Sequence, residues 1–140
     1  MQVKLNRIDH DFHFEAYGAS EVAVHIDGAP NIGGHNAGAR PMELMLMGLG
    51  GCSAIDVILI LRKQKQEAQA ISITVQAERA QNQTPAVFTK IHVHYVFTGM
   101  LHPDKVERAI HLSMEKYCSV TAMLNKTAQI THSFEILPPQ

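Results

Sequence analysis

The sequence predicts an α+β fold, because the expected strands come in blocks that helices separate. Three observations carry this prediction. Apolar residues alternate at a period of two near the amino terminus, a long apolar segment begins at Pro41, and the alternation returns from Ile71. The predicted order is βββ-α-ββ-α-α-β, and blocks of this kind argue against a doubly wound parallel sheet.

Three short antiparallel strands are expected before residue 30, since apolar residues there alternate with polar or small ones. These apolar residues are Val3 and Leu5, then Phe12, Phe14 and Ala16, then Val22, Val24 and Ile26. Turn-forming residues follow at Tyr17-Gly18 and at Asp27-Gly28. The glycine-rich stretch from Gly28 to Arg40 is expected to be a long ordered loop, because too little chain precedes it to fold alone.

A long, mostly buried helix is expected over residues 41–68, opened by a proline in its first turn and closed by a charged turn. It contains Gly48, Gly50 and Gly51, and each glycine costs a helix interior about 1 kcal/mol relative to alanine. Two explanations stay open. The missing side chains let another helix approach closely, or they leave room for a ligand beside Cys52.

Five more elements are expected after this helix, each from its own apolar period. They are a strand at 71–78, a partner strand at 87–98, a helix from Pro103 toward Cys118, a short helix at 119–126 and a last strand at 131–137. The helix from Pro103 carries one apolar stripe, which is typical of a surface helix packed on a core.

Composition predicts one globular domain over residues 1–140, with 46% hydrophobic and 18% charged residues. Twelve basic and thirteen acidic residues give a formal charge of −1. Nucleic acid is therefore excluded as an expected partner, because phosphate binding needs a basic face. The amino terminus lacks the apolar core of a signal peptide, and no apolar run is expected to cross a bilayer. We expect a cytoplasmic protein without a membrane partner.

The two cysteines, Cys52 and Cys118, lie 66 positions apart, so they form neither a redox CxxC motif nor a zinc-type cluster. In a reducing compartment they are expected to be thiols. Two thiols are the minimum set for thiol peroxide chemistry. One attacks the O–O bond, and the other condenses with the sulfenic acid before it is oxidised further. The alternative is that both are small buried hydrophobic residues.

Three motifs resemble the OsmC/Ohr family, the osmotically induced and organic-hydroperoxide-resistance proteins. They are RPMEL at 40–44, GGCSAIDV at 50–57 and EKYCSV at 115–120. The resemblance covers essentially the whole chain. It implies an OsmC-like fold and an intertwined homodimer, with two central helices flanked by antiparallel sheets. It also implies a thiol peroxidase in which Cys52 attacks an organic hydroperoxide and Cys118 resolves the sulfenic acid to a disulfide. A dithiol such as a lipoylated protein would reduce that disulfide, and no bound cofactor is expected.

Two departures separate this chain from active peroxidases of that family, which carry a glutamate directly after the helix-start proline and an arginine in an N-terminal loop. Here Met42 follows the proline, and the acid stands at Glu43. At about 100° per residue, Glu43 and Cys52 lie on nearly opposite faces of a straight helix, so Glu43 does not inherit the role. The arginine is also missing, since Arg7 lies in an expected strand and Arg40 does not match by position.

Asp56 lies one helical turn after Cys52 on the same face. A bare carboxylate there would raise the pKa of the thiol, whereas a hydrogen-bonded one can accept the thiol proton or orient substrate. Its role is left open. Cys118 precedes a short helix whose N-terminus favours a thiolate, and Lys116 adds positive charge nearby.

Peroxidase activity is one of three hypotheses that remain. The second is a relative that kept the cysteines but binds an apolar small molecule or senses redox state, which the altered Met42 position motivates. The third is an interaction domain with inert buried thiols.

The histidines and methionines have simpler interpretations. His92 and His94 share a face of one strand but lack a third ligand, so no metal site is expected. His35 and His132 have no spacing partner. Met42, Met45 and Met47 are interpreted as core residues, with an apolar ligand pocket as the alternative.

Overall fold

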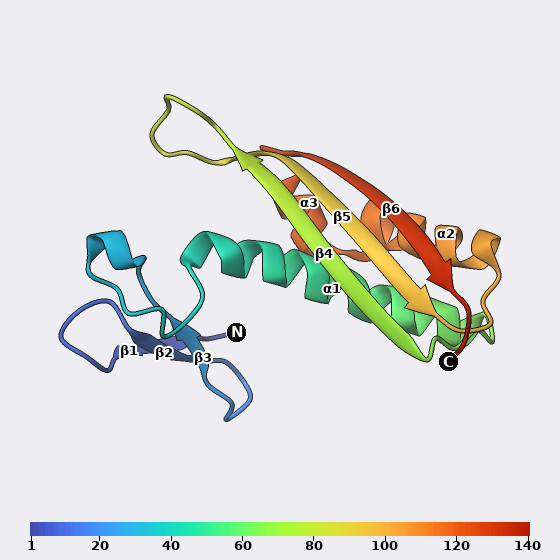
Figure 1. The fold of residues 1–140 in the computed structure, drawn as a ribbon, viewed down its shortest axis with the longest axis horizontal. Coiled ribbons are helices and arrows are strands. Elements are labelled where there is room, and N and C mark those ends of the chain that lie inside the picture. Colours follow the sequence, from blue (N-terminus) through green and yellow to red (C-terminus); the bar gives the residue numbers. More distant parts are fainter. The chain divides into compact units, whose positions relative to one another are not determined.

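The structure is a computed structural model that describes residues 1–140, and its contacts divide the chain into two compact units, Met1–Leu46 and Met47–Gln140. Strands and helices follow one another in the predicted order, which confirms the α+β class (Figure 1). The single domain over 1–140 stays a prediction, and each unit is described by itself.

The unit Met1–Leu46 is built on a three-stranded antiparallel sheet. Its strands are β1 (Lys4–Arg7), β2 (Phe14–Tyr17) and β3 (Val24–Ile26), in that spatial order. Arg7 pairs with Phe14 across the first ladder, so it lies in a strand as expected. The glycine-rich loop contains a single 3₁₀ turn, η1 (Pro30–Ile32). Gly34 is required there, because a Cβ at this position would lie 1.8 Å from the carbonyl oxygen of Gly28.

Helix α1 (Pro41–Lys63) begins at the expected proline and ends five residues before the expected boundary. Lys65 adopts a left-handed conformation with φ of 56°. The amide of Gln66 then donates to the carbonyl of Leu61 at 2.8 Å, which closes the helix end. The buried residues of α1 recur about every four positions and so face one way; they are Leu49, Gly50, Ser53, Val57 and Leu61.

The unit Met47–Gln140 contains a three-stranded mixed sheet of β4 (Ala70–Arg79), β5 (Phe88–Thr98) and β6 (Gln129–Leu137). Strands β4 and β5 are antiparallel, as the resemblance implied. Strand β6 instead runs parallel to β5, which corrects the expectation of purely antiparallel sheets. The reason is the helical crossover between β5 and β6, since such a connection returns the chain in the same direction.

Helices cover one face of this sheet (Figure 1), and every second residue of β5 from Ile91 to Phe97 is buried. These buried residues are Ile91, Val93, Tyr95 and Phe97. Helix α2 (Pro103–Leu112) buries Val106, Ala109 and Ile110 in the same core. The core of this unit therefore lies between the inner face of the sheet and the helices.

The crossover holds a five-residue π-helical turn, η2 (Ser113–Tyr117), between α2 and α3 (Ser119–Leu124). The sequence predicts one continuous helix to Tyr117, because a π turn leaves no mark in apolar spacing. The turn closes where the amide of Cys118 donates to the carbonyl of Ser113 at 2.8 Å. π turns recur at functional sites, since they redirect side chains within a helix.

Helix α1 is also long and apolar enough to span a bilayer, by length and composition alone, with a mean hydropathy of 2.2 over 18 residues. This corrects the expectation that no apolar run reaches that length. The core helix of a folded domain meets the same criterion, and 28% of the 18-residue segment is buried within the chain.

Candidate functional site

The structure brings the two cysteines and Asp56 together within the unit Met47–Gln140. Cys52 and Asp56 project from α1, one turn apart, and Cys118 lies at the start of α3. The two sulfur atoms and a carboxylate oxygen of Asp56 all lie within 4.8 Å of one another. Both cysteines are free thiols, with Cys52 half-buried and Cys118 buried. Residues 66 positions apart thus form one site.

The three glycines near Cys52 have different surroundings. A Cβ at Gly50 would lie 3.3 Å from a methyl of Val75, so this glycine lets α1 pack closely on β4. Cβ atoms at Gly48 and Gly51 would meet nothing within 4 Å. The close neighbour of Gly50 is strand β4 rather than another helix, and the positions of Gly48 and Gly51 face open space within this chain.

Cys118 is the N-cap residue of α3, and its sulfur accepts a hydrogen bond from the amide of Thr121 at 3.4 Å. Burial nevertheless raises the pKa of the Cys118 thiol, with Cys52 raising it further, while the hydrogen bonds from Thr121 oppose the shift. The Thr121 amide at the helix N-terminus does favour the thiolate, as expected, but desolvation outweighs this effect and the net shift of the pKa is upward.

A chain of buried hydroxyl groups leads from the sheet to Asp56. The Tyr95 hydroxyl lies 2.5 Å from Ser53 Oγ, and Ser113 Oγ lies 3.0 Å from Ser53 Oγ. Ser113 Oγ also donates to Asp56 Oδ2 at 3.1 Å. Tyr95, Ser53 and Ser113 are fully buried. Burial raises the pKa of Tyr95 to about 12.

No sequence motif marks these three hydroxyl residues as part of a site. The only signal for Ser53 and Ser113 is a small polar residue in an apolar helical stretch, which is common in soluble proteins. Tyr95 stands on the buried face of an alternating strand, where an aromatic residue is expected in any case.

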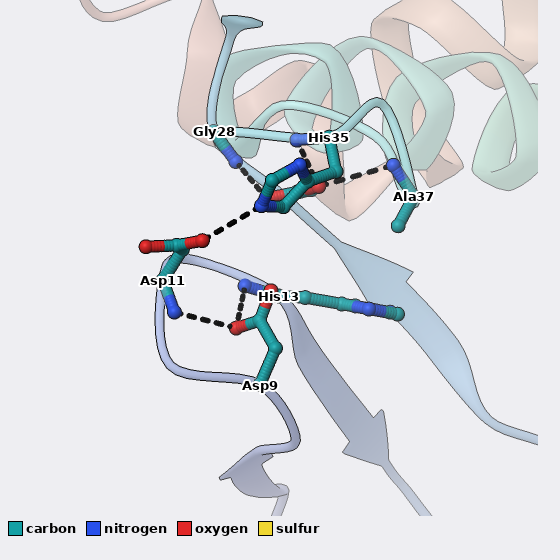
Figure 2. A network of polar contacts seen from close by, with 7 residues as sticks. Asp9, Asp11, His13, Gly28, His35 and Ala37 are labelled. Atoms are coloured by element: carbon teal, nitrogen blue, oxygen red, sulfur yellow. Dashed lines mark hydrogen bonds and ion pairs between the residues drawn. The ribbon is translucent and has the colours of Figure 1, made fainter. Parts of the chain in front are cut away.

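A second cluster lies in the unit Met1–Leu46. Figure 2 shows the carboxylate of Asp11 pointing at the ring of His35, with Nε2 and Oδ2 2.7 Å apart. Asp9 Oδ1 accepts hydrogen bonds from the amides of Asp11 and His13. The hydrogen bond that the His35 ring donates to Asp11 is the largest cause of the raised pKa of His35. His35 therefore has a partner that spacing in the sequence does not reveal.

Buried Asp27 organises the glycine-rich loop that carries His35. Its carboxylate accepts three hydrogen bonds, from the amides of Gly28, His35 and Ala37, at 2.7, 2.9 and 3.0 Å (Figure 2). The bond from Ala37 is the largest cause of the lowered pKa of Asp27. The loop is ordered, as predicted, and one carboxylate holds both its ends.

Glu43 and Arg40 have structural roles at the start of α1. Glu43 Oε1 accepts a hydrogen bond from the Arg40 amide at 2.9 Å, as in half of a capping box. The Arg40 guanidinium donates to the carbonyl of Gly38 and to the side chain of Asn36. Both side chains thus cap the helix and its entry loop, which agrees with the expectation that Glu43 does not serve the thiol.

The remaining candidate residues have contacts within the sheet or on the surface. The ring nitrogens of His92 lie 2.7 and 2.8 Å from the hydroxyls of Thr131 and Ser133, and Nδ1 of His94 lies 2.7 Å from the Ser133 hydroxyl. Both histidines thus have hydrogen-bond partners on β6. Lys116 lies over the ring of Tyr117.

The methionines do not all fill the core. Met45 and Met47 are 44% and 56% exposed, so their interpretation as core residues is wrong. Met42 is half-buried.

The site therefore unites two thiols and a carboxylate beside a mixed sheet that helices cover. The OsmC-like protein family matches residues 34–133. This chain therefore belongs to the OsmC-like family, and the resemblance seen in the sequence motifs is confirmed.

Three relatives illustrate the range of similarity. Protein YhfA of Escherichia coli K12 is 47% identical over 98 residues, which are 69% of this chain and 72% of the relative. A hypothetical protein from Aquifex aeolicus has a solved structure with a TM-score of 0.85 at 30% identity, covering 99% and 97% of the two chains. An organic hydroperoxide resistance protein OsmC from Legionella pneumophila shares the fold, with a TM-score of 0.70 at 16% identity over 96% and 95%.

Proposed function

We propose that this protein is a thiol peroxidase that reduces organic hydroperoxides to alcohols. The observation that carries the proposal is the position of the Cys52 and Cys118 sulfurs, within 4.8 Å of each other and of Asp56 in an OsmC-like fold. A disulfide needs an S–S distance of about 2 Å, so side-chain rotation and a small shift join the two. The hydroperoxide resistance named for the Legionella pneumophila neighbour supports the same chemistry.

The proposed cycle has two steps in the protein. The sulfur of Cys52 attacks the distal oxygen of the hydroperoxide, an S–O bond forms, the O–O bond breaks, and the alcohol leaves with the thiol proton. The sulfur of Cys118 then attacks the sulfenic acid, so that a disulfide forms and water leaves. Cys52 is assigned the attack because it is the more exposed thiol. An external dithiol of the lipoyl type returns both thiols, without a bound cofactor, in the cytoplasm.

A homodimer forms part of the proposal. Three residues of α1, eight and then four positions apart, form an exposed apolar stripe: Met47, Ile55 and Leu59 are 56%, 62% and 51% exposed. Gly51 lies in the same stripe, and a Cβ there would meet nothing. A second copy of α1 fits such a stripe, because a small residue at its centre lets two helices approach closely. Cys52 adjoins Gly51, so the site would lie beside the dimer interface.

The second candidate is a relative that binds an apolar small molecule or senses redox state. The observation that favours it is the use of Glu43 and Arg40 as helix caps, which leaves no acid–arginine pair assigned to the thiol. This candidate predicts a slow thiol, whereas the peroxidase predicts rapid oxidation.

Intact mass spectrometry of the reduced protein after cumene hydroperoxide, and separately hydrogen peroxide, tests the proposal. We expect a loss of about 2 Da with a Cys52–Cys118 cross-link, and a faster reaction with the organic peroxide. Cys118→Ser should stop at oxygen adducts of Cys52, and Cys52→Ser should abolish turnover. The same samples sprayed under native conditions should show two chains. An unchanged mass, or equal turnover of wild type and Cys52→Ser, would exclude the peroxidase.

A further inference from the structure

The buried hydroxyl groups are joined to Asp56 through Ser113. Ser113 Oγ donates toward both Ser53 Oγ, at 3.0 Å, and Asp56 Oδ2, at 3.1 Å, so its one hydroxyl proton is directed at two acceptors. The hydroxyls of Ser53 and Tyr95 form the next contact, in which either can be the donor. Ser113 is therefore the residue that holds the carboxylate to the buried hydroxyl groups.

Tyr95 lies at the end of the hydroxyl chain that is farthest from Asp56. Burial raises the pKa of Tyr95 to about 12, so the phenol keeps its proton across the range in which proteins work. Tyr95 is held on β5 in the centre of the sheet, with the stacked ring of Phe97 beside it. The chain therefore anchors Oδ2 of Asp56 to the core of the fold. Oδ1 has no hydrogen bond within the chain and lies free for another donor.

Residues from three elements surround Asp56 beside the two sulfurs. Cys52 shares its helix face, Cys118 comes from the start of α3, and Tyr95 comes from β5. Cys118 also lines a cavity of about 170 Å³, together with Glu115, Lys116 and His132 among others. Burial raises the pKa of the Cys118 thiol. The Cys118 proton must therefore leave as its sulfur attacks.

We propose that Asp56 is the proton shuttle for both half-reactions at the two sulfurs, a role that rests on the peroxidase function proposed above. In the first, the Cys52 thiol proton passes to Asp56 as the S–O bond forms, and Asp56 passes it to the alkoxide released when the O–O bond breaks. In the second, the Cys118 thiol proton passes to Asp56 as the S–S bond forms, and then to the hydroxide released from the sulfenic acid, giving water. The carboxylate ends each step unchanged.

This assignment explains the departures found in the sequence. The acid one position after Pro41 is absent, and Glu43 caps α1 instead. Asp56 supplies a carboxylate from the same helix one turn beyond Cys52, held by Ser113 from the π turn η2. Ser113 begins the π turn and donates to Asp56 on α1, and Cys118 follows directly after the turn. The irregular turn thus brings both residues to the site.

Asp56→Asn tests the shuttle through two rates, peroxide reduction and alkylation of Cys52, measured at pH 7 on the whole protein. Only the first should fall. The amide keeps the shape but cannot take a proton, so reduction of cumene hydroperoxide should slow about 100-fold. Alkylation of Cys52 by iodoacetamide, which needs only a thiolate, should stay equal or become faster, because the nearby negative charge is gone. Added formate should restore part of the peroxide rate. Asp104→Asn, an exposed position on α2, should change neither rate.

Ser113→Ala is the second variant, and it serves if Asp56→Asn fails to fold by circular dichroism. It keeps the carboxylate but removes its donor, so the peroxide rate should fall about 10-fold while alkylation is preserved. Parallel loss of both rates in the folded variants would mean that Asp56 only maintains access to the thiol, and would overturn the shuttle. A wild-type peroxide rate in Asp56→Asn would do the same. Wild type inert toward peroxide would instead overturn the peroxidase itself.

Discussion

Two clusters in this chain bring three ionisable side chains within 4.8 Å, and they differ in what surrounds them. Cys52, Asp56 and Cys118 are half-buried or buried, and the carboxylate among them is held by a hydroxyl chain from three elements. In the other cluster, His35 and Asp11 have side chains that are 60% and 48% exposed. Asp9 accepts only from amides of its own loop.

Short distances between ionisable side chains therefore do not by themselves make a reactive site. Water solvates the Asp11–His35 pair, so the pair contributes little and changes little when one partner is lost. The carboxylate of the cysteine cluster instead accepts a hydrogen bond from the buried hydroxyl group of Ser113. The first arrangement holds a loop closed, whereas the second can move a proton between defined atoms.

The largest effect on stability is expected from Tyr95→Phe, which removes the phenol hydroxyl from the buried chain. Ser53 then loses its hydrogen-bond partner on β5, and the free energy of unfolding should fall by about 1 kcal/mol. Urea unfolding monitored by circular dichroism measures the change. Tyr117→Phe is the matched control, because Tyr117 is 51% exposed and should unfold like wild type. Equal stability of both variants would show that the chain adds nothing to the core.

The sequence could predict much of this fold because its periods are local. Val24 and His25 alternate within one strand, and Pro41 marks a helix start by its own backbone restriction. The parallel pairing of β6 could not be predicted in this way, since it depends on how the crossover returns the chain. The five-residue turn at Ser113 also leaves no signal, because one π turn only shifts the helical period slightly.

The site also contains residues that the sequence could indicate and residues that it could not. Cys52 and Cys118 could be singled out as chemically special residues, with the motifs supplying their pairing. Ser53 and Ser113 could not, because their contact joins residues 60 positions apart and depends on packing of α1 against η2. Asp27 is similar, since nothing local shows that one aspartate accepts amides from residues up to ten positions away. Tertiary contacts of ordinary residues are the part that local patterns miss.

A smaller and more local effect is expected from Asp27→Asn. The amide side chain has one acceptor oxygen in place of two, so the amides of His35 and Ala37 lose their charged partner. Amide hydrogen exchange at these two positions should become about three-fold faster. The pKa of Asp27 is lowered from 3.8. In wild type, the stabilising contribution is therefore present above pH 3.8 and is lost as the pH falls through the lower value of the folded state.

Asp104→Asn is again the control for Asp27→Asn, since it changes the same chemical group at an exposed position of the other unit. Its exchange at His35 and Ala37 should equal that of wild type. Unchanged exchange in Asp27→Asn would show that the backbone of the glycine-rich loop keeps its own order, and that the carboxylate is only a passenger.

The smallest effect is expected from Asp11→Asn, which removes the exposed partner of His35. The pKa of His35 is raised above 6.5, first by its hydrogen bond with Asp11. A raised value means that the pair contributes below pH 6.5 and that the contribution is lost as the pH rises through the folded-state pKa. NMR titration of the ring should show a lower midpoint in the variant, with peroxide reduction unchanged. His132, whose pKa is lowered by its own burial, should not move. An unmoved His35 midpoint would mean that water already screens the pair completely, and the contrast with the buried carboxylate would then be at its sharpest.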